Sequence, residues 1–246
     1  MIKFFRKIRY NLMEQNKTGK YFKYAIGEIV LVVIGILIAL SINNWNEKQK
    51  SDVKTQDYYV QLLDDLNSDK LFAEQIIEKF NNYLKLYEAY TSTYNKGVLI
   101  PTAVYEQISK LPVQTTAITF NSSTIESLQN SGDVGLIPSI IRNRLIDLRR
   151  QQDHTIKRAD WVADGKNDII QTLAPLLGSS TLPERLVNQP KMREFLNIDK
   201  NLKELILIYE GVHRWKSITE QESIDRLEDM LKEIDTIVEL INKELK

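Results

Sequence analysis

The side chain with the clearest chemical potential is Glu28, a carboxylate at the start of an otherwise uncharged apolar run. A carboxylate inside a membrane span is a functional candidate by default, often in a proton relay. Glu28, however, lies only four residues beyond the aromatic Tyr24, where it can reach interfacial water. The residue therefore fits either a working acid or the polar boundary of the run.

The other residues that could do chemistry lack the companions that chemistry needs. His154 and His213 stand alone on expected long helices, without a second histidine or glutamate at metal-ligand spacing, so we expect packed or solvated histidines and no metal or cofactor. Ser122 and Ser123 lie in no nucleophile elbow, and Ser123 with Glu126 predicts a capping box. No enzymatic activity is predicted.

Polar and aromatic clusters also favour structural roles. The loop "NSGDVGL", residues 130–136, lacks a phosphate-binding fingerprint, and Gly132 predicts a tight turn with positive φ. Six tyrosines recur at helical spacing and are expected in the core rather than in a ligand groove. They are Tyr58, Tyr59, Tyr83, Tyr87, Tyr90 and Tyr94. Beyond the apolar run the chain is acidic overall, so no nucleic acid is expected as a partner.

The apolar run predicts a transmembrane helix over residues 24–45. From Tyr24 to Ile42 only Glu28 is charged, and these nineteen residues span about 28 Å as a helix. Aromatic residues that favour the membrane interface flank the run. The expected interfacial anchors are Tyr21, Tyr24 and Trp45.

Charge asymmetry predicts the orientation of that helix. Residues 1–24 contain seven lysines and arginines against the single Glu14, and there is no cysteine in the chain. By the positive-inside rule the N-terminus stays in the cytoplasm and residues 46–246 lie outside it. Residues 1–23 are expected to form a basic amphipathic segment on anionic lipid, or alternatively a solvated tail.

Two other readings of the apolar run remain open. Ala39-Leu40-Ser41 could serve as the cleavage site of a signal peptide, although the polar region before the run is much longer than is usual for a signal. A buried core helix of a soluble protein is the second reading, and the asymmetric charge of the flanks speaks against it.

Periodicity after the run predicts an all-α domain. Residues 45–94 contain neither proline nor glycine and read as one long helix, and a second long helix is expected over 199–245. Shorter helices are expected at 101–111, 124–130, from Pro138 to about residue 173, and at 191–197. Trp161 is expected to face inward from the helix that Pro138 opens. The fold class is therefore a transmembrane helix followed by an elongated antiparallel helical bundle.

Two stretches resemble an uncharacterised family of single-span envelope proteins of Gram-negative bacteria, a domain of unknown function. They are the N-terminal "MIKFFRKIRYNLMEQNKTGKYFKYAIGEIVLVVIGILIALSINNWNE" and the later "ITFNSSTIESLQNSGDVGLI". The resemblance implies an N-terminal anchor and a helical domain outside the cytoplasm. It implies no catalytic residues.

The function expected from the sequence is a membrane-anchored interaction or scaffolding module. The domain would lie in the periplasm and bind envelope proteins or copies of itself, with the bilayer as a further partner. The helix-packing face would be Glu28, Val32, Gly35 and Ala39, which share one direction at 100° per residue and include a pair of small residues. One alternative is a periplasmic ligand-sensing module that acts through a partner. Another is the acidic-anchor subunit of a proton-driven membrane complex, with Glu28 titrating in a membrane relay.

Overall fold

The computed structural model describes residues 6, 10, 18–179 and 181–246, and every regular element in this part of the chain is helical. The expected all-α class is confirmed. In chain order the elements are α2 (Thr18–Ser92), η1 (Thr93–Asn95), α3 (Pro101–Ile108), α4 (Ser123–Ser131), η2 (Asp133–Leu136), α5 (Ser139–Gln171), α6 (Ala174–Leu177), α7 (Leu182–Arg185), α8 (Pro190–Phe195), η3 (Ile198–Asn201) and α9 (Leu202–Glu244).

The chain divides into two compact units, residues 1–57 and 58–246, and helix α2 contributes to both. The domain boundary expected at residue 46 stays a prediction. The basic segment expected over 1–23 lies largely outside the described residues.

The first unit contains an apolar helix near the N-terminus. One helix in the described residues is long and apolar enough to cross a membrane, and its most apolar 18-residue window has a mean hydropathy of 2.8 and is 0% buried. Side chains along this part of α2, such as Leu31 and Ile42, are exposed. A helix that is apolar on all sides and unburied among the described residues differs from the core helix of a soluble protein, which is mostly buried.

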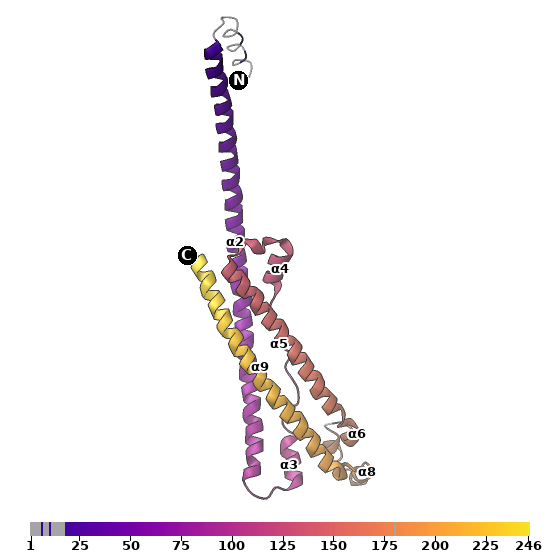
Figure 1. The fold of residues 1–246 in the computed structure, drawn as a ribbon. Helices are drawn as coiled ribbons and strands as arrows, with labels where there is room; N and C mark the ends of the chain where they lie inside the picture. Colours follow the sequence, from indigo (N-terminus) through magenta and orange to yellow (C-terminus); the bar gives the residue numbers. More distant parts are fainter. Residues whose placement is uncertain (1–5, 7–9, 11–17, 180) are drawn as a thin grey trace. The chain divides into compact units, whose positions relative to one another are not determined.

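The second unit is a bundle built on α2, α5 and α9 (Figure 1). Along α2 and α9, Lys70 contacts Asp235, Tyr83 contacts His213 and Tyr90 contacts Glu210. Because the numbers rise on one helix as they fall on the other, the two helices are antiparallel, as expected for two long helices of one bundle.

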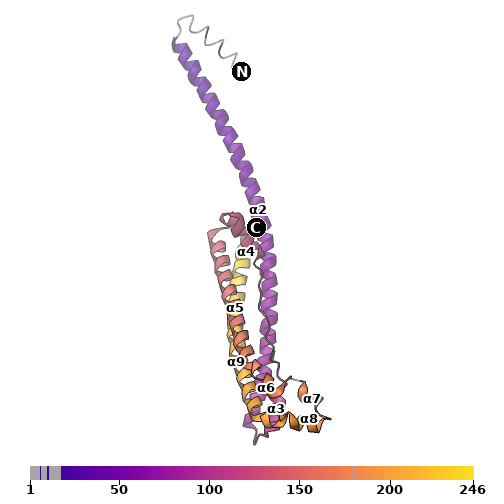
Figure 2. The ribbon, with the colours of Figure 1, turned by 90° about the vertical axis from the view of Figure 1, so that its right-hand side faces the viewer.

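Helix α5 is also antiparallel to α9. Arg144 pairs with Glu233 at 2.8 Å and Arg158 with Glu222 at 3.0 Å, and both figures of the ribbon show these two helices side by side (Figures 1 and 2). It follows that α2 and α5 run parallel within the bundle. The chain between them must therefore travel back along the bundle, and residues 112–122, here called the connecting segment, make that journey without helical structure.

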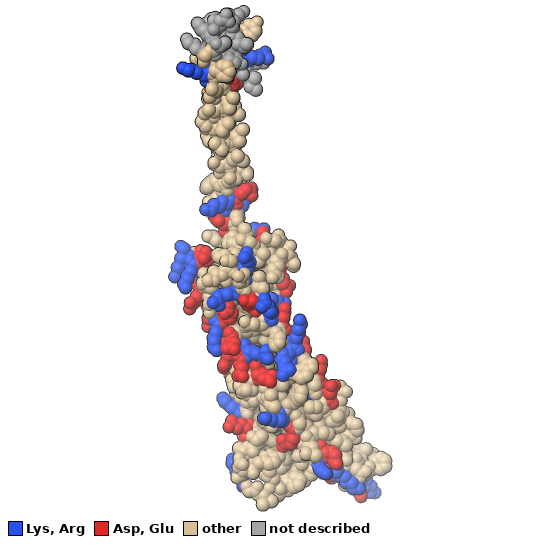
Figure 3. All heavy atoms as spheres, viewed as in Figure 1, with Lys and Arg blue, Asp and Glu red and all other residues tan. Residues whose placement is uncertain are grey.

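Two hydrophobic clusters fill the bundle. The larger one joins α2, α4, α5 and α9 and includes Leu62, Leu128 and Ile234. The smaller one joins the C-terminal end of α2, helix α3, helix α6 and the start of α9, and it includes Ile108 and Leu205. Figure 3 shows acidic and basic side chains interspersed over the visible face of the bundle, which fits a solvated surface.

Two expectations about local packing were wrong. Trp161 was expected to face inward from α5, but it is 55% exposed and Val162 is buried instead. The indole of Trp161 lies 5.8 Å from that of Trp215, with Arg158 4.6 Å above its ring. An aromatic side chain can make such contacts at the surface and keep a wet edge.

The start of α4 also differs from the prediction. Its first residues do not form the predicted capping box, because the hydroxyl of Ser123 donates to Asp65 of α2 and that of Ser122 donates to Glu126. The amide of Thr124 also donates to Asp65, at 3.1 Å. A carboxylate from another helix thus satisfies a free N–H at this helix start.

The predicted end of α4 at Gly132 is confirmed. Gly132 closes the helix with φ 77° in the left-handed region, where glycine carries no steric cost.

Candidate functional site

Helix α9 interrupts its apolar core face with buried polar side chains between Val212 and Ile224. They are His213, Lys216, Ser217, Thr219 and Glu220. Sequence reasoning missed this cluster because it traced only apolar residues along α9. A signal was present, since Lys216 and Glu220 continue the three- and four-residue spacing of the core positions around them.

Two buried lysines bind the start of the connecting segment. The Nζ of Lys216 donates to the carbonyl oxygens of Pro112 and Gln114, at 2.8 Å each. Lys166, from α5, donates to the carbonyl oxygen of Val113 between them. Three successive carbonyl groups outside any helix thereby gain a hydrogen-bond partner, although residues 112–114 are themselves exposed or half-buried. Burial lowers the pKa of both lysines.

Glu220 is the counterion of this cluster and is incompletely paired. Its Oε1 lies 3.4 Å from the Nζ of Lys216, while its Oε2 is buried without a hydrogen-bond partner. Burial raises the pKa of Glu220 to about 7, against the opposing effect of Lys216. A buried carboxylate oxygen without a donor is costly.

Aromatic side chains complete the cluster on the side of α2. The ring of Tyr83 lies 3.9 Å from the Nζ of Lys216, a cation–π contact. The hydroxyl of Tyr83 lies 3.1 Å from both Nδ1 and the carbonyl oxygen of His213. His213 is fully buried, and burial, aided by the charge of Lys216, lowers its pKa to about 4. The imidazole is therefore neutral near pH 7.

The end of the connecting segment is bound by aspartates instead. The carboxylate of Asp69 accepts the amide of Asn121 at 2.6 Å and the side-chain amide of Gln152 at 2.8 Å. Burial raises the pKa of Asp69 to about 6, although both hydrogen bonds oppose the shift. Together with Asp65, this residue ties α2 to the segment and to the start of α4.

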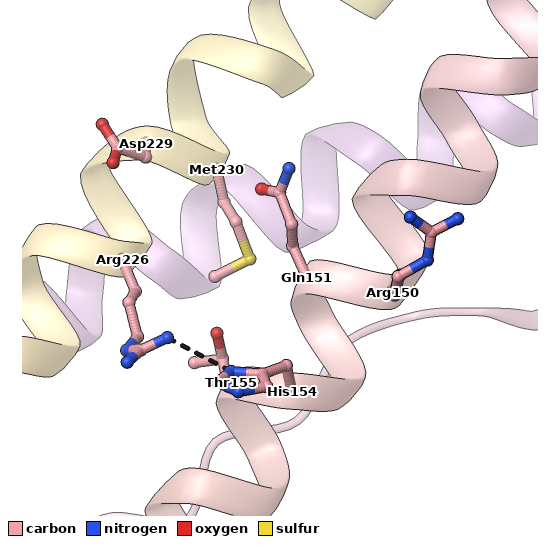
Figure 4. A pocket seen from close by; sticks show the side chains of 7 residues that line it. All are labelled: Arg150, Gln151, His154, Thr155, Arg226, Asp229 and Met230. Atoms are coloured by element: carbon pink, nitrogen blue, oxygen red, sulfur yellow. Dashed lines mark hydrogen bonds between the residues drawn. The ribbon is translucent and has the colours of Figure 1, made fainter.

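A cavity of about 370 Å³ lies between α5 and α9 (Figure 4). Arg226 donates to the Nδ1 of His154 at 3.1 Å, and Arg150, which also lines the cavity, pairs with Asp147 at 3.1 Å. His154, singled out from the sequence, is thus held by an arginine at an open surface.

The two histidines weighed as candidates for chemistry are not brought together. His154 and His213 lie in different cavities or clusters, and within the described part of the chain no group of three or more histidine, aspartate or glutamate side chains is placed to hold a metal ion. The tyrosines expected in the core are mostly there: Tyr58, Tyr59, Tyr83 and Tyr90 are buried, while Tyr94 is 46% exposed.

The expected helix-packing face lies on α2 in the first unit. Glu28 is half-buried, while Val32 and Ala39 are exposed, and a Cβ added to Gly35 would meet no other described atom within 4 Å. Val32, Gly35 and Ala39 are thus accessible, and the packing of this face against another helix stays a prediction. Of the expected interfacial anchors, Tyr24 and Trp45 are exposed. The side chain of Tyr21 lies outside the described residues.

Comparison with known proteins adds one similarity. No curated protein and no solved structure matches the chain. Residues 28–149, just under half of the chain, match the model of a family described as "Family of unknown function (DUF6090)".

Proposed function

We propose that this protein is a non-enzymatic, single-span protein of the inner membrane, whose helical domain binds envelope proteins or copies of itself in the periplasm. Its N-terminus would stay in the cytoplasm. The proposal extends the family resemblance to single-span envelope proteins of Gram-negative bacteria and treats the apolar helix as a retained anchor.

The observation that carries the proposal is the apolar part of α2. Its most apolar window has a mean hydropathy of 2.8 and none of it is buried. Exposed aliphatic side chains over that length are unfavourable in water and favourable in lipid. The lysines and arginines that precede the helix support a cytoplasmic N-terminus.

The absence of native cysteine makes the topology directly testable. Lys23→Cys and Gln49→Cys place one thiol on each side of the apolar helix. We expect a membrane-impermeant maleimide to label Gln49→Cys in cells with a permeabilised outer membrane, and to label Lys23→Cys only after lysis. Labelling of Lys23→Cys in unlysed cells would refute the orientation. A mature protein whose mass lacks the apolar helix would identify a cleaved signal instead.

Self-association through the helix-packing face can be tested in the same cysteine-free background. Ala39→Cys lies on that face, and Leu37→Cys lies roughly opposite to Glu28 on the helix. We expect oxidation in membranes to cross-link Ala39→Cys into dimers much more than Leu37→Cys. Equal cross-linking of both variants would exclude this face as the contact between copies.

Binding to other envelope proteins is the second arm of the proposal. The full chain, solubilised with its anchor intact, would be recovered after chemical cross-linking in membranes. If cross-linking gave only monomers, without a second copy or a partner, the interaction function would be rejected.

A further inference from the structure

A cavity of about 280 Å³ lies where α2, the connecting segment and α9 meet. Its lining includes the polar side chains of Lys79, Asn82, Gln114, Thr116, Lys216 and Glu220. It is distinct from the cavity of His154, and its inner wall is the buried polar cluster. A small concave site with a few convergent polar groups is typical of small-ligand binding.

Glu220 supplies an unused hydrogen-bond acceptor at this cavity. The residue is only 5% exposed, and its Oε2 is buried without a partner. The terminal torsion of a glutamate is broad, so a modest rotation of the carboxylate can bring Oε2 toward the cavity that Glu220 lines. A ligand that donates a hydrogen bond here would relieve an unpaired buried acceptor.

Hydrogen-bond donors for a ligand lie at the rim of the same cavity. Lys79, on α2, is exposed and forms no hydrogen bond or ion pair within the described part of the chain. The side-chain amides of Asn82 and Gln114 line the same cavity and can donate as well. These groups suit an acceptor with negative charge, such as a carboxylate.

The balance of charge favours an anionic ligand. Two lysines, Lys79 and Lys216, line the cavity against one carboxylate, Glu220. The donors of Lys216 are already directed at two carbonyl oxygens and at Glu220. Lys79 is therefore the cation with donors left for a ligand, and Glu220 is the acceptor left for one.

We propose that this cavity binds a small carboxylate that also carries a hydrogen-bond donor on the neighbouring carbon, an α-hydroxy or α-amino acid. Its carboxylate pairs with Lys79 and its hydroxyl or ammonium group donates to Glu220. The proposal concerns the second unit alone and does not depend on the membrane anchor or on the partners proposed above.

Titration calorimetry of the purified full chain in detergent tests the ligand class with matched probes. Glycolate and glycine carry both groups, acetate lacks the donor and ethanolamine lacks the carboxylate. We expect millimolar glycolate or glycine to bind, and acetate and ethanolamine to bind at least about tenfold more weakly. Comparison of the first two probes identifies the donor as hydroxyl or ammonium.

Two variants and one control test the residues. Lys79→Gln and Glu220→Gln should each weaken binding about tenfold, whereas Lys85→Gln, an exposed lysine of α2 outside the lining of this cavity, should bind like the wild type. Because Lys79 is exposed, its replacement tests the site even if Glu220→Gln impairs folding.

Absence of binding by both glycolate and glycine would overturn the proposal. So would acetate binding as tightly as glycolate, or wild-type affinity in Lys79→Gln. None of these results bears on topology or cross-linking, so failure here is separate from failure of the proposed function.

Discussion

The connecting segment is held by opposite chemistry at its two ends. At its start, Lys166 and Lys216 donate to carbonyl oxygens of residues 112–114. At its end, Asp69 accepts the amide of Asn121, and Asp65 accepts that of Thr124 just beyond the segment. A segment without helical structure does not pair its own backbone groups, and here charged side chains from three helices bind them.

The two ends differ in how completely their charges are compensated. Asp69 receives two hydrogen bonds from neutral amides. Glu220 has only one contact with Lys216 and retains a buried oxygen without a partner. The lysine end is therefore the more costly arrangement to break and the better candidate for a site that binds something else.

The largest effect is expected from Lys216→Met. It removes two hydrogen bonds to carbonyl oxygens and the ion-pair partner of the buried Glu220, so the free energy of unfolding should fall by about 3 to 5 kcal/mol. Chemical denaturation of the full chain in detergent would measure it. Lys232→Met, an exposed lysine on the same helix, serves as the control and should change stability by less than about 0.5 kcal/mol. Similar losses in the two variants would mean that the buried Lys216 stabilises the fold no more than an exposed lysine does.

Asp69→Ala is the matching change at the aspartate end. It leaves the amides of Asn121 and Gln152 without their acceptor, and the expected loss of unfolding free energy is about 2 kcal/mol. The exposed Asp64 lies on the same helix, and Asp64→Ala is the control. A loss larger than that of Lys216→Met would reverse the ranking of the two ends.

Protonation should separate the two ends by pH. Burial raises the pKa of Glu220 from 4.5 to about 7 and that of Asp69 from 3.8 to about 6. Because the folded state holds these protons more tightly, each group contributes stability at low pH that is lost as pH rises to its folded pKa.

Thermal unfolding between about pH 4 and pH 8 measures this difference by comparison of variants. Glu220→Gln should remove the decline that ends near pH 7, and Asp69→Asn the one that ends near pH 6. His213, whose pKa is lowered to about 4, acts in the opposite direction in all three proteins and cancels in the comparison. Identical pH profiles for wild type and Glu220→Gln would contradict the effect of burial on this carboxylate.

The smallest effect is expected from Asp65→Ala, which removes the acceptor at the start of α4. Loss of a helix cap costs about 1 kcal/mol, and Ser122→Ala, whose hydroxyl bonds Glu126 rather than a backbone amide, is the control and should cost less. If the two changes proved equal, the cap from α2 would add nothing to the local hydrogen bonds of α4.

Much of the fold could be predicted from periodicity. Helix α9 (Leu202–Glu244) was expected over 199–245, and α5 (Ser139–Gln171) over about 138–173. The turn at Gly132 followed from the conformational freedom of glycine. Patterns of this kind are local, and local sequence encodes them.

The candidate site could not be predicted in the same way. Its charged residues belong to two helices: Lys166 lies on α5, whereas Lys216 and Glu220 lie on α9, about fifty residues further along the chain. The carbonyl partners of the two lysines belong to a third segment. The expected capping box failed for the same reason, because Asp65 on a distant helix competes for Ser123 and the amide of Thr124.

By itself, the sequence determined the helical class, the element order and an apolar helix at the N-terminus, because hydrophobic periodicity and uninterrupted apolar length are properties of neighbouring residues. Only the tertiary structure decided which charges are buried and what they bind. That α2 and α5 run parallel forces a non-helical segment to return along the bundle. The unpaired backbone groups of that segment determine where buried lysines and aspartates are stable.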